Sequence, residues 1–302
     1  MNYIDLHVHS SISDGTLTPT EVVQLAMQKG LQAIALTDHD TVDGVKEAMD
    51  AANRLATTDY KLQVIPGTEL SASYKGEDIH ILGLFLDYEN KELLSTLTNV
   101  AKEREQRNEK MCSNLQKAGI DVSVEKLRGG NTDVILTRAH FAKYMLEHGY
   151  VSSMKQAFEK YLDSKGPYYV SREYLSPKQA IDLILSAGGV PVLAHPLLYK
   201  LSPNELEKLL RELVSYGLQG IEAIYSCNVS NDESYVKGLA RKYGLKISGG
   251  SDFHGSVKKD IELGTGRGNL KVPASLLDSL DFSNSKATTN KQRPTNNATT
   301  KC

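Results

Sequence analysis

The first segment of this chain constrains it most, because two histidines lie at the end of one short apolar strand. Residues 3–8 read Tyr-Ile-Asp-Leu-His-Val, and His9 and a polar loop with Asp14 follow. Alternate side chains of a strand share a face, so His7 and His9 lie on one side, about 7 Å apart. Two imidazoles on a rigid support can bind a metal ion. A pair of hydrogen-bonded histidines in a half-buried strand explains this segment equally well, so the rest of the chain must decide.

The composition is that of an ordinary soluble globular protein. The chain has 302 residues, 40% hydrophobic and 24% charged, which is enough for one large domain or two ordinary ones. It has no apolar run of the roughly 18 residues that a membrane span needs, and its first residues are too polar for a secretory signal. Its cysteines, Cys112, Cys227 and Cys302, are odd in number and widely spaced. They favour a reducing compartment, the cytoplasm, over a disulfide framework or a zinc finger.

The net charge of −2 is unevenly distributed along the chain. Residues 1–100 contain 15 acidic and 6 basic side chains, whereas residues 101–185 contain 14 basic and 11 acidic ones. Acidic groups near histidines favour cation binding, and a mildly basic middle segment favours an anionic substrate. The tail from residue 284, rich in Asn, Thr and Lys, is predicted to be disordered.

Strand and helix patterns alternate along most of the chain. Capping boxes at residues 18–21 and 176–179 predict two helix starts. Further helices are predicted at residues 42–56, 91–117, 206–216 and 235–243. Strands are predicted at residues 33–36, 62–65, 189–195, 220–224 and 246–248, with a β-hairpin at residues 70–86. This alternation indicates βαβ units around a parallel sheet, and residues 101–175 are predicted to form a small helical insertion.

Ionisable side chains follow these strands where each strand ends. They are His7, His9, Asp14, His39, Glu69, His80, His195, Asp252 and His254. Loops at the carboxyl ends of parallel strands converge on one pocket, so we expect a single cluster. Nitrogen and oxygen ligands without thiolates suit two or three divalent ions such as Mn²⁺, Zn²⁺ or Fe²⁺. Clustered ions generate hydroxide near neutral pH and stabilise phosphoryl transfer, so the predicted reaction class is phosphoester hydrolysis.

The segments that contain these residues resemble the PHP (polymerase and histidinol phosphatase) superfamily. They are DLHVHSSISDG at 5–15, ALTDHDT at 35–41, GTELS at 67–71, HILG at 80–83, LAHP at 193–196 and GSDFH at 250–254. The resemblance covers nearly the whole chain except the tail. It implies a distorted (β/α)₇ barrel with a trinuclear metal site inside its mouth.

The resemblance also implies a role for each candidate ligand. The first ion would be held by His7, His9 and Asp252, and the second by His80 and His195, with Glu69 bridging the two. The third ion would be held by Asp14, His39 and His254. The catalytic residues would be Asp14, His39 and Glu69, around a metal-bridging hydroxide as the nucleophile.

Asp14 and the insertion resemble the branch that contains 3′,5′-nucleotide bisphosphate phosphatases and short-RNA 5′→3′ exonucleases. In that branch the insertion has an R-x-H-[FI]-A segment, here residues 138–142, and a later G-K-x-P-x-Y-like segment. The later segment reads KGPY at 165–168, with lysine and glycine in reversed order. Arg138, His140 and Lys165 are the predicted substrate-binding residues, because a second phosphate needs fixed cations. A surface ion pair for Arg138 and a core position for His140 are the alternatives.

We therefore predict a cytoplasmic metal-dependent phosphoesterase with a small nucleotide as its substrate. The substrates would be 3′,5′-bisphosphonucleosides, such as adenosine 3′,5′-bisphosphate, and the 5′ ends of short RNA. The alternatives are another PHP phosphatase, such as a histidinol-phosphate phosphatase, and a non-catalytic nucleic-acid-binding module. The predicted domains are a barrel from residues 1–100 and 176–283, the insertion at 101–175, and the tail at 284–302.

Overall fold

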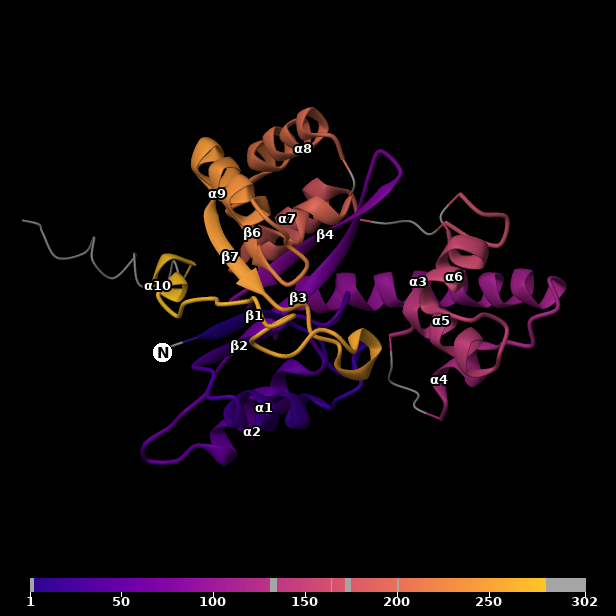
Figure 1. The fold of residues 1–302 in the computed structure, drawn as a ribbon, viewed down its shortest axis with the longest axis horizontal. Helices are drawn as coiled ribbons and strands as arrows, with labels where there is room; N and C mark the ends of the chain where they lie inside the picture. Colours follow the sequence, from indigo (N-terminus) through magenta and orange to yellow (C-terminus); the bar gives the residue numbers. More distant parts are fainter. Residues whose placement is uncertain (1–2, 131–134, 164, 172–174, 200, 281–302) are drawn as a thin grey trace, which may run out of the picture.

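The computed structural model describes residues 3–130, 135–163, 165–171, 175–199 and 201–280. Within them, a seven-stranded sheet has its strands in sequence order, and helices pack around it (Figure 1). The strands are β1 (Ile4–Val8), β2 (Ala33–Leu36), β3 (Gln63–Tyr74), β4 (Glu77–Leu84), β5 (Val190–Leu193), β6 (Gly220–Tyr225) and β7 (Lys246–Gly250). The helices around them are α1 (Pro19–Gln28), α2 (Val45–Leu55), α7 (Pro177–Ser186), α8 (Pro203–Tyr216), α9 (Asp232–Tyr243) and α10 (Leu276–Leu280).

The sheet curves until its first and last strands meet. The β1–β2, β2–β3, β5–β6 and β6–β7 pairs are parallel, and β4 is antiparallel to both β3 and β5. The amide of Asp252 donates to the carbonyl of His7 at 2.9 Å, and the amide of His9 donates to the carbonyl of Phe253 at 3.0 Å. These bonds place the residues after β7 beside β1. The predicted seven-stranded barrel is confirmed, with an antiparallel hairpin inserted among parallel strands.

Gly250 allows β7 to lie directly against β1. A Cβ atom at this position would lie 2.4 Å from the Cβ of His7 and 2.5 Å from its backbone nitrogen. Real Cβ atoms do not tolerate such contacts, so a larger residue would push the two strands apart. The absence of a side chain at residue 250 therefore helps to set the position of His7.

Replacing Gly250 with alanine should lower the free energy of unfolding by about 1–3 kcal/mol, the usual cost of overpacking. Gly238 in α9 provides a matched control, since a Cβ there would meet nothing within 4 Å. Gly238→Ala should raise stability by about 0.5–1 kcal/mol, because alanine is the better helix former. Denaturant unfolding of both variants measures the two effects. Equal stability of Gly250→Ala and the parent protein would contradict the close approach.

The third strand is longer than predicted. The sequence suggested that it ends at Pro66, but β3 continues to Tyr74 and changes its partner from β2 to β4. Pro66 does not interrupt the strand, because its carbonyl still accepts the amide of Leu86 at 3.1 Å. Gly67 fits because a Cβ there would lie only 2.9 Å from the carbonyl oxygen of Gly83. Glu69 therefore lies inside a strand and not in a loop after one, and the predicted hairpin is confirmed.

A helical cap lies to one side of the barrel (Figure 1). It contains the C-terminal half of α3 (Lys91–Lys117), α4 (Val124–Arg128), α5 (Arg138–Glu147), α6 (Met154–Ala157) and a π-helical turn at Phe158–Leu162. Leu93 and Leu97 of α3 pack in the barrel core, whereas Met111 and Leu115 pack with Phe141 in a separate cap core. The single helix α3 therefore joins the two parts and crosses the predicted boundary at residue 101. The predicted tail lies outside the described residues.

None of the helices that the structure describes is long and apolar enough to cross a membrane.

Candidate metal centre

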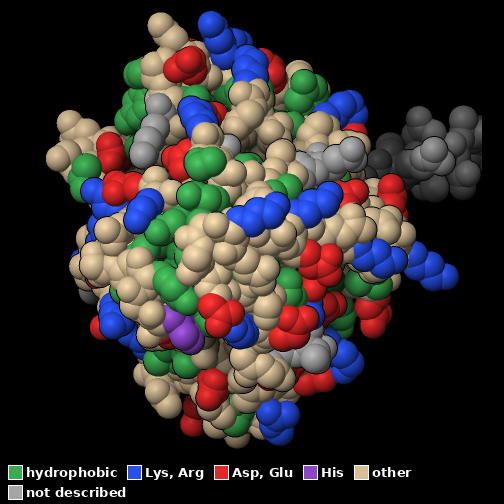
Figure 2. Space-filling model, turned by 90° about the vertical axis from the view of Figure 1, so that its right-hand side faces the viewer, with side chains coloured by type: hydrophobic (Ala, Val, Ile, Leu, Met, Phe, Trp, Pro, Cys, Tyr) green, Lys and Arg blue, Asp and Glu red, His purple; other side chains and the backbone are tan. Residues whose placement is uncertain are grey.

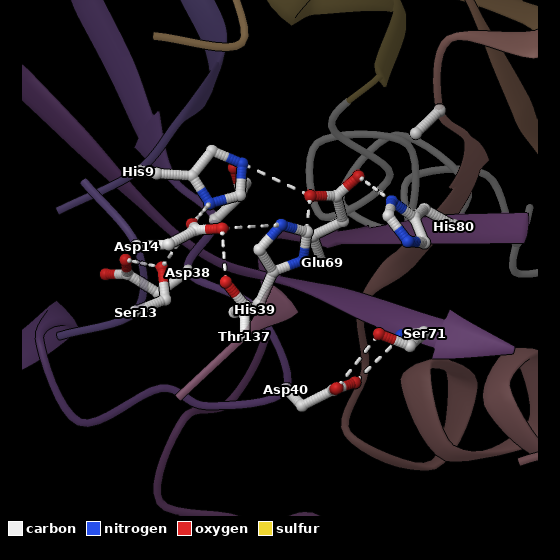
Figure 3. Close-up of polar contacts among 12 residues, drawn as sticks. His9, Ser13, Asp14, Asp38, His39, Asp40, Glu69, Ser71, His80 and Thr137 are labelled. Atoms are coloured by element: carbon white, nitrogen blue, oxygen red, sulfur yellow. Dashed lines mark hydrogen bonds and ion pairs between the residues drawn. The ribbon is translucent and has the colours of Figure 1, made fainter. Parts of the chain in front are cut away.

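The barrel brings the predicted metal ligands together, and Figure 3 shows Glu69 between His9, His39 and His80. Its Oε1 lies 2.8 Å from His80 Nδ1 and 2.9 Å from His195 Nε2. Its Oε2 lies between 3.2 and 3.3 Å from ring nitrogens of three further histidines, namely His7, His9 and His39. One buried carboxylate from β3 thus faces imidazoles from both sides of the barrel.

Asp14 and Asp252 supply the other carboxylates of the cluster. Oδ1 of Asp14 lies 3.2 Å from His254 Nε2, and its Oδ2 lies 3.8 Å from His39 Nε2. Oδ1 of Asp252 lies 3.5 Å from His9 Nε2 and 3.3 Å from His254 Nδ1. Both carboxylates are buried. Oδ2 of Asp252 also accepts the hydroxyl of Tyr225 at 2.8 Å and lies 2.6 Å from Lys258 Nζ.

The backbone around the cluster is held in an unusual conformation. Asp40, His195 and Asp252 have positive φ angles of 53°, 26° and 57°. Such angles cost free energy in non-glycine residues and collect at functional sites. Asp40 follows His39 directly, and its amide donates to the carbonyl of Glu69 at 3.0 Å. The strained loop after β2 is therefore hydrogen-bonded to β3 at Glu69, the residue that the other candidate ligands surround.

The environment favours ionised carboxylates and shifts the pKa values of the imidazoles in both directions. Burial alone would raise the pKa of Glu69, but His80, His39 and His7 hold it well below its ordinary value. Burial likewise opposes ionisation of Asp14, and His254 and His39 nevertheless hold its pKa well below the usual range. Burial lowers the pKa of His9 and lowers that of His39 further. Burial also opposes protonation of His7 and His80, but the pKa of each is raised, because Glu222 and Glu69 lie beside His7 and Glu69 lies beside His80. Metal ions bind ionised carboxylates and neutral imidazoles, so a cation bound by His7 or His80 would take the place of a proton.

Glu222 of β6 orients two of the candidate ligands by binding His7 through Nδ1 and His195 through its backbone amide. Its Oε1 lies 3.0 Å from His7 Nδ1, and its Oε2 accepts the amide of His195 at 2.7 Å. When His7 donates from Nδ1, its Nε2 lone pair is left facing the cluster. Carboxylates that bind the far nitrogen of a histidine are typical of metal sites.

The residues fit divalent metal ions. Among the described residues, several buried ring nitrogens form no hydrogen bond of acceptable geometry, even those near Glu69: His7 Nε2, His9 Nδ1, His9 Nε2 and His195 Nδ1. Ligand atoms lie within 4.8 Å of one another in three groups: His9, Asp14, His39 and His254; His7, His9 and Glu69; and His39, Glu69 and His80. Imidazole and carboxylate donors without thiolate suit Zn²⁺, Mn²⁺ and Fe²⁺. A bound cation would use the lone pairs that the protein leaves unpaired.

A cavity extends from this cluster towards the cap. Asp14, His39 and His80 line it on the barrel side, and Arg104, Arg107 and Arg138 line it on the cap side. Arg138 donates to Asp78 Oδ2 at 2.7 Å, and its guanidinium lies 5.6 Å from the ring centre of Tyr169. Of the predicted substrate-binding residues, Arg138 is therefore the one that lies beside the candidate metal centre.

His140 and Lys165 are not among the described residues that line that cavity, although His140 Nδ1 lies 3.3 Å from Thr137 Oγ1, which contacts Asp14. Nδ1 of His140 accepts the amide of Thr137 at 3.0 Å and so completes the capping box of α5. Nζ of Lys165 lies 3.6 Å from Glu77 Oε1 near the tip of the β3–β4 hairpin, and its side chain is 82% exposed. In this structure His140 thus caps a helix of the cap, and Lys165 forms an exposed ion pair.

Arg104, Arg107 and Glu222 were missed from the sequence. Glu222 had a signal, because it is a lone acid within the apolar segment Gly220–Tyr225. Arg104 and Arg107 lie in a helix with many charged residues, and both are buried. Nothing in the sequence of that helix separates a buried arginine from a solvated one.

A nearly closed α/β barrel with a buried imidazole–carboxylate cluster is the arrangement of a metal-binding hydrolase fold. Residues 5–216 match the family model of the PHP domain, and the chain belongs to this family. It is 36% identical over 255 residues to the 3′,5′-nucleoside bisphosphate phosphatase of Chromobacterium violaceum, covering 84% of this chain and 88% of that protein. It is 35% identical over 250 residues to the 5′-3′ exoribonuclease of Haemophilus influenzae, covering 83% and 89%.

A similar solved structure is that of a protein from Bifidobacterium adolescentis described as a metal-dependent phosphoesterase. The TM-score is 0.80 at 26% identity, and the match covers 94% of this chain and 98% of that one. The resemblance found in the sequence is confirmed by these comparisons.

Proposed function

We propose that this chain is a metal-dependent phosphoesterase that hydrolyses 3′,5′-bisphosphonucleosides, such as adenosine 3′,5′-bisphosphate, to the nucleoside monophosphate and phosphate. The 5′ ends of short RNA are the second proposed substrate. The observation that carries the proposal is the position of Arg138, which shares one cavity with Asp14, His39 and His80. The activities named for the bacterial relatives support the same substrate class.

The proposed ligands divide into three sets around Glu69. One ion would be held by His7, His9 and Asp252, a second by His80 and His195, and a third by Asp14, His39 and His254. Glu69 is suited to bridge the first two, because its Oε1 faces His80 and His195 while its Oε2 faces His7 and His9. Bound Mn²⁺, Zn²⁺ or Fe²⁺ ions supply Lewis acidity and a hydroxide nucleophile near neutral pH.

The cap residues would hold the part of the substrate that does not react. Arg138 binds the second phosphate through charge-assisted hydrogen bonds, in place of or together with Asp78. Its hydrogen bond to Asp78 and its contact with Tyr169 hold the guanidinium beside the cavity before substrate arrives. Ordering the cation in advance reduces the entropy lost on binding.

Both alternative functions are less well supported. A histidinol-phosphate phosphatase would use the same cluster, but its substrate carries a single phosphate and leaves none for Arg138 to bind. A non-catalytic RNA-binding module would use a broad basic surface. The cap-side face in Figure 2 instead shows Lys and Arg side chains interleaved with Asp and Glu. The arginines that line the cavity therefore favour recognition of a small, highly charged ligand.

Protein stripped of metal and refilled with Mn²⁺ should release inorganic phosphate from adenosine 3′,5′-bisphosphate, and stripped protein should not. Phosphate release with and without refilling is the measurement, with histidinol phosphate tested in parallel. Turnover of histidinol phosphate alone would keep the metal centre and refute the proposed substrate. Equal activity before and after stripping would refute the metal centre.

A further inference from the structure

Thr137, the residue that begins α5 in the cap, contacts a candidate metal ligand of the barrel. Its Oγ1 lies 3.1 Å from Oδ2 of Asp14, and the residue is 7% exposed (Figure 3). The same oxygen accepts the amide of Ala139 at 3.2 Å. His140 Nδ1, which lies 3.3 Å away, already accepts the amide of Thr137. The single hydroxyl proton of Thr137 is therefore directed to the carboxylate.

A second bond joins the same two segments two residues earlier. The amide of Ile135 donates to the carbonyl of Ile12 at 3.1 Å. Residues 12–14 of the first barrel loop and residues 135–137 of the cap therefore lie side by side, and the contact repeats at the two-residue spacing of extended chains. The barrel loop that carries Asp14 is thus joined to the cap by two hydrogen bonds, one of them to Asp14 itself.

The contact from Thr137 determines how Asp14 presents its oxygens. Because Oδ2 is held by Thr137, the carboxylate keeps Oδ1 close to His254 Nε2, at 3.2 Å. Ser13 Oγ lies 3.4 Å from that same Oδ1. Hydrogen bonds to a ligating carboxylate fix its orientation and tune its affinity for metal.

We propose that Thr137 is a positioning residue through which the cap completes the metal position formed by Asp14, His39 and His254. The inference rests on the proposed function, because it takes these three residues as ligands. Cap docking and metal binding are then coupled, and the coupling acts in both directions. A docked cap raises the affinity of this position for metal, and a bound ion holds the cap against the barrel.

Equilibrium binding of Mn²⁺ to metal-stripped full-length protein tests the proposal. Thr137→Val keeps the branched shape but removes the hydroxyl, whereas Thr137→Ser keeps it. In the valine variant the dissociation constant of the most weakly bound Mn²⁺ ion should rise roughly tenfold, the usual effect of losing a hydrogen bond to a metal ligand. In the serine variant it should stay near the value of the parent protein. Ser123→Ala is the matched control, since Ser123 caps α4 of the same cap through the amide of Lys126.

Hydrogen exchange of the α5 amides gives a second readout that does not depend on turnover. Saturating Mn²⁺ should slow exchange in the parent protein and in Ser123→Ala, and should have a much smaller effect in Thr137→Val. Unchanged Mn²⁺ affinity in Thr137→Val would overturn the proposal while leaving the proposed function intact. Equal losses in Thr137→Val and Ser123→Ala would also overturn it, because cap stability alone would explain them. A parent protein without saturable Mn²⁺ binding would refute the proposed metal centre itself.

Discussion

Replacing Glu69 with glutamine should reduce phosphate release from adenosine 3′,5′-bisphosphate by on the order of 10³-fold. Glutamine keeps the size of the side chain but removes its charge and turns one acceptor oxygen into a donor. That donor would face ring nitrogens that now lie between 2.8 and 3.3 Å from the carboxylate. Metal ions contribute several kcal/mol of transition-state stabilisation, and each 1.36 kcal/mol is tenfold in rate. Steady-state kinetics together with metal content measure the effect.

Glu77→Gln is the matched control for this substitution. Glu77 lies on the same hairpin, but its side chain is 48% exposed and lies 3.6 Å from Lys165. It should keep the metal content and the turnover of the parent protein. A thermal melt of both variants separates loss of the site from loss of the fold. Full activity and full metal content in Glu69→Gln would remove this residue from the centre.

Most of the candidate ligands could be predicted from the sequence, because they interrupt an apolar strand or follow one, whereas Asp14 lies further along the loop after β1. His7, His195 and Asp252 are polar residues in segments that are otherwise suited to burial, and such residues need partners. Strand order then places these three together, since parallel strands present their carboxyl ends on one side of the sheet. Glu69 and His80 lie inside the antiparallel pair β3 and β4, so this argument does not place them. This prediction needed only the order of the strands along the chain and no coordinates.

Other features of the site depend on long-range contacts that the local sequence pattern does not predict. The third strand was predicted at residues 62–65, but it pairs through the Pro66 carbonyl and continues to Tyr74. Thr137 caps α5, and its bond to Asp14 joins residues separated by 123 positions. Arg104 donates to Asp40 and lies 3.4 Å from Ser71 Oγ, partners that only the docking of α3 brings close. Long-range packing decides these three cases.

The same limit applies to Asp5, a buried acid within β1. Burial raises the pKa of Asp5 to about 6, and its carboxylate accepts the amides of Ser251 and Gly264, each at 2.8 Å. The sequence shows an acid in an apolar strand, which predicts a partner. The sequence does not show that the partners are backbone amides of residues about 250 positions further along the chain. These hydrogen bonds help to close the barrel beside His7.

Arg138→Ala should raise KM for adenosine 3′,5′-bisphosphate by roughly 10- to 100-fold, with a smaller change in kcat. The reason is the loss of charge-assisted hydrogen bonds to the phosphate that does not react, worth about 1.5–3 kcal/mol. A simple aryl phosphate monoester has no second phosphate and should lose little. Parallel kinetics with both substrates measure the difference.

Arg128→Ala is the control for loss of a cap arginine. Arg128 lies in α4 and pairs with Glu105 at 3.0 Å, and it is not among the described residues that line the cavity beside the metal centre. It should leave both substrates nearly unaffected. Equal losses on both substrates in Arg138→Ala would mean that the Arg138–Asp78 bond only holds the cap in place. A loss confined to the bisphosphate would mean that Arg138 exchanges Asp78 for phosphate, which makes the cap the part of the chain that selects the substrate.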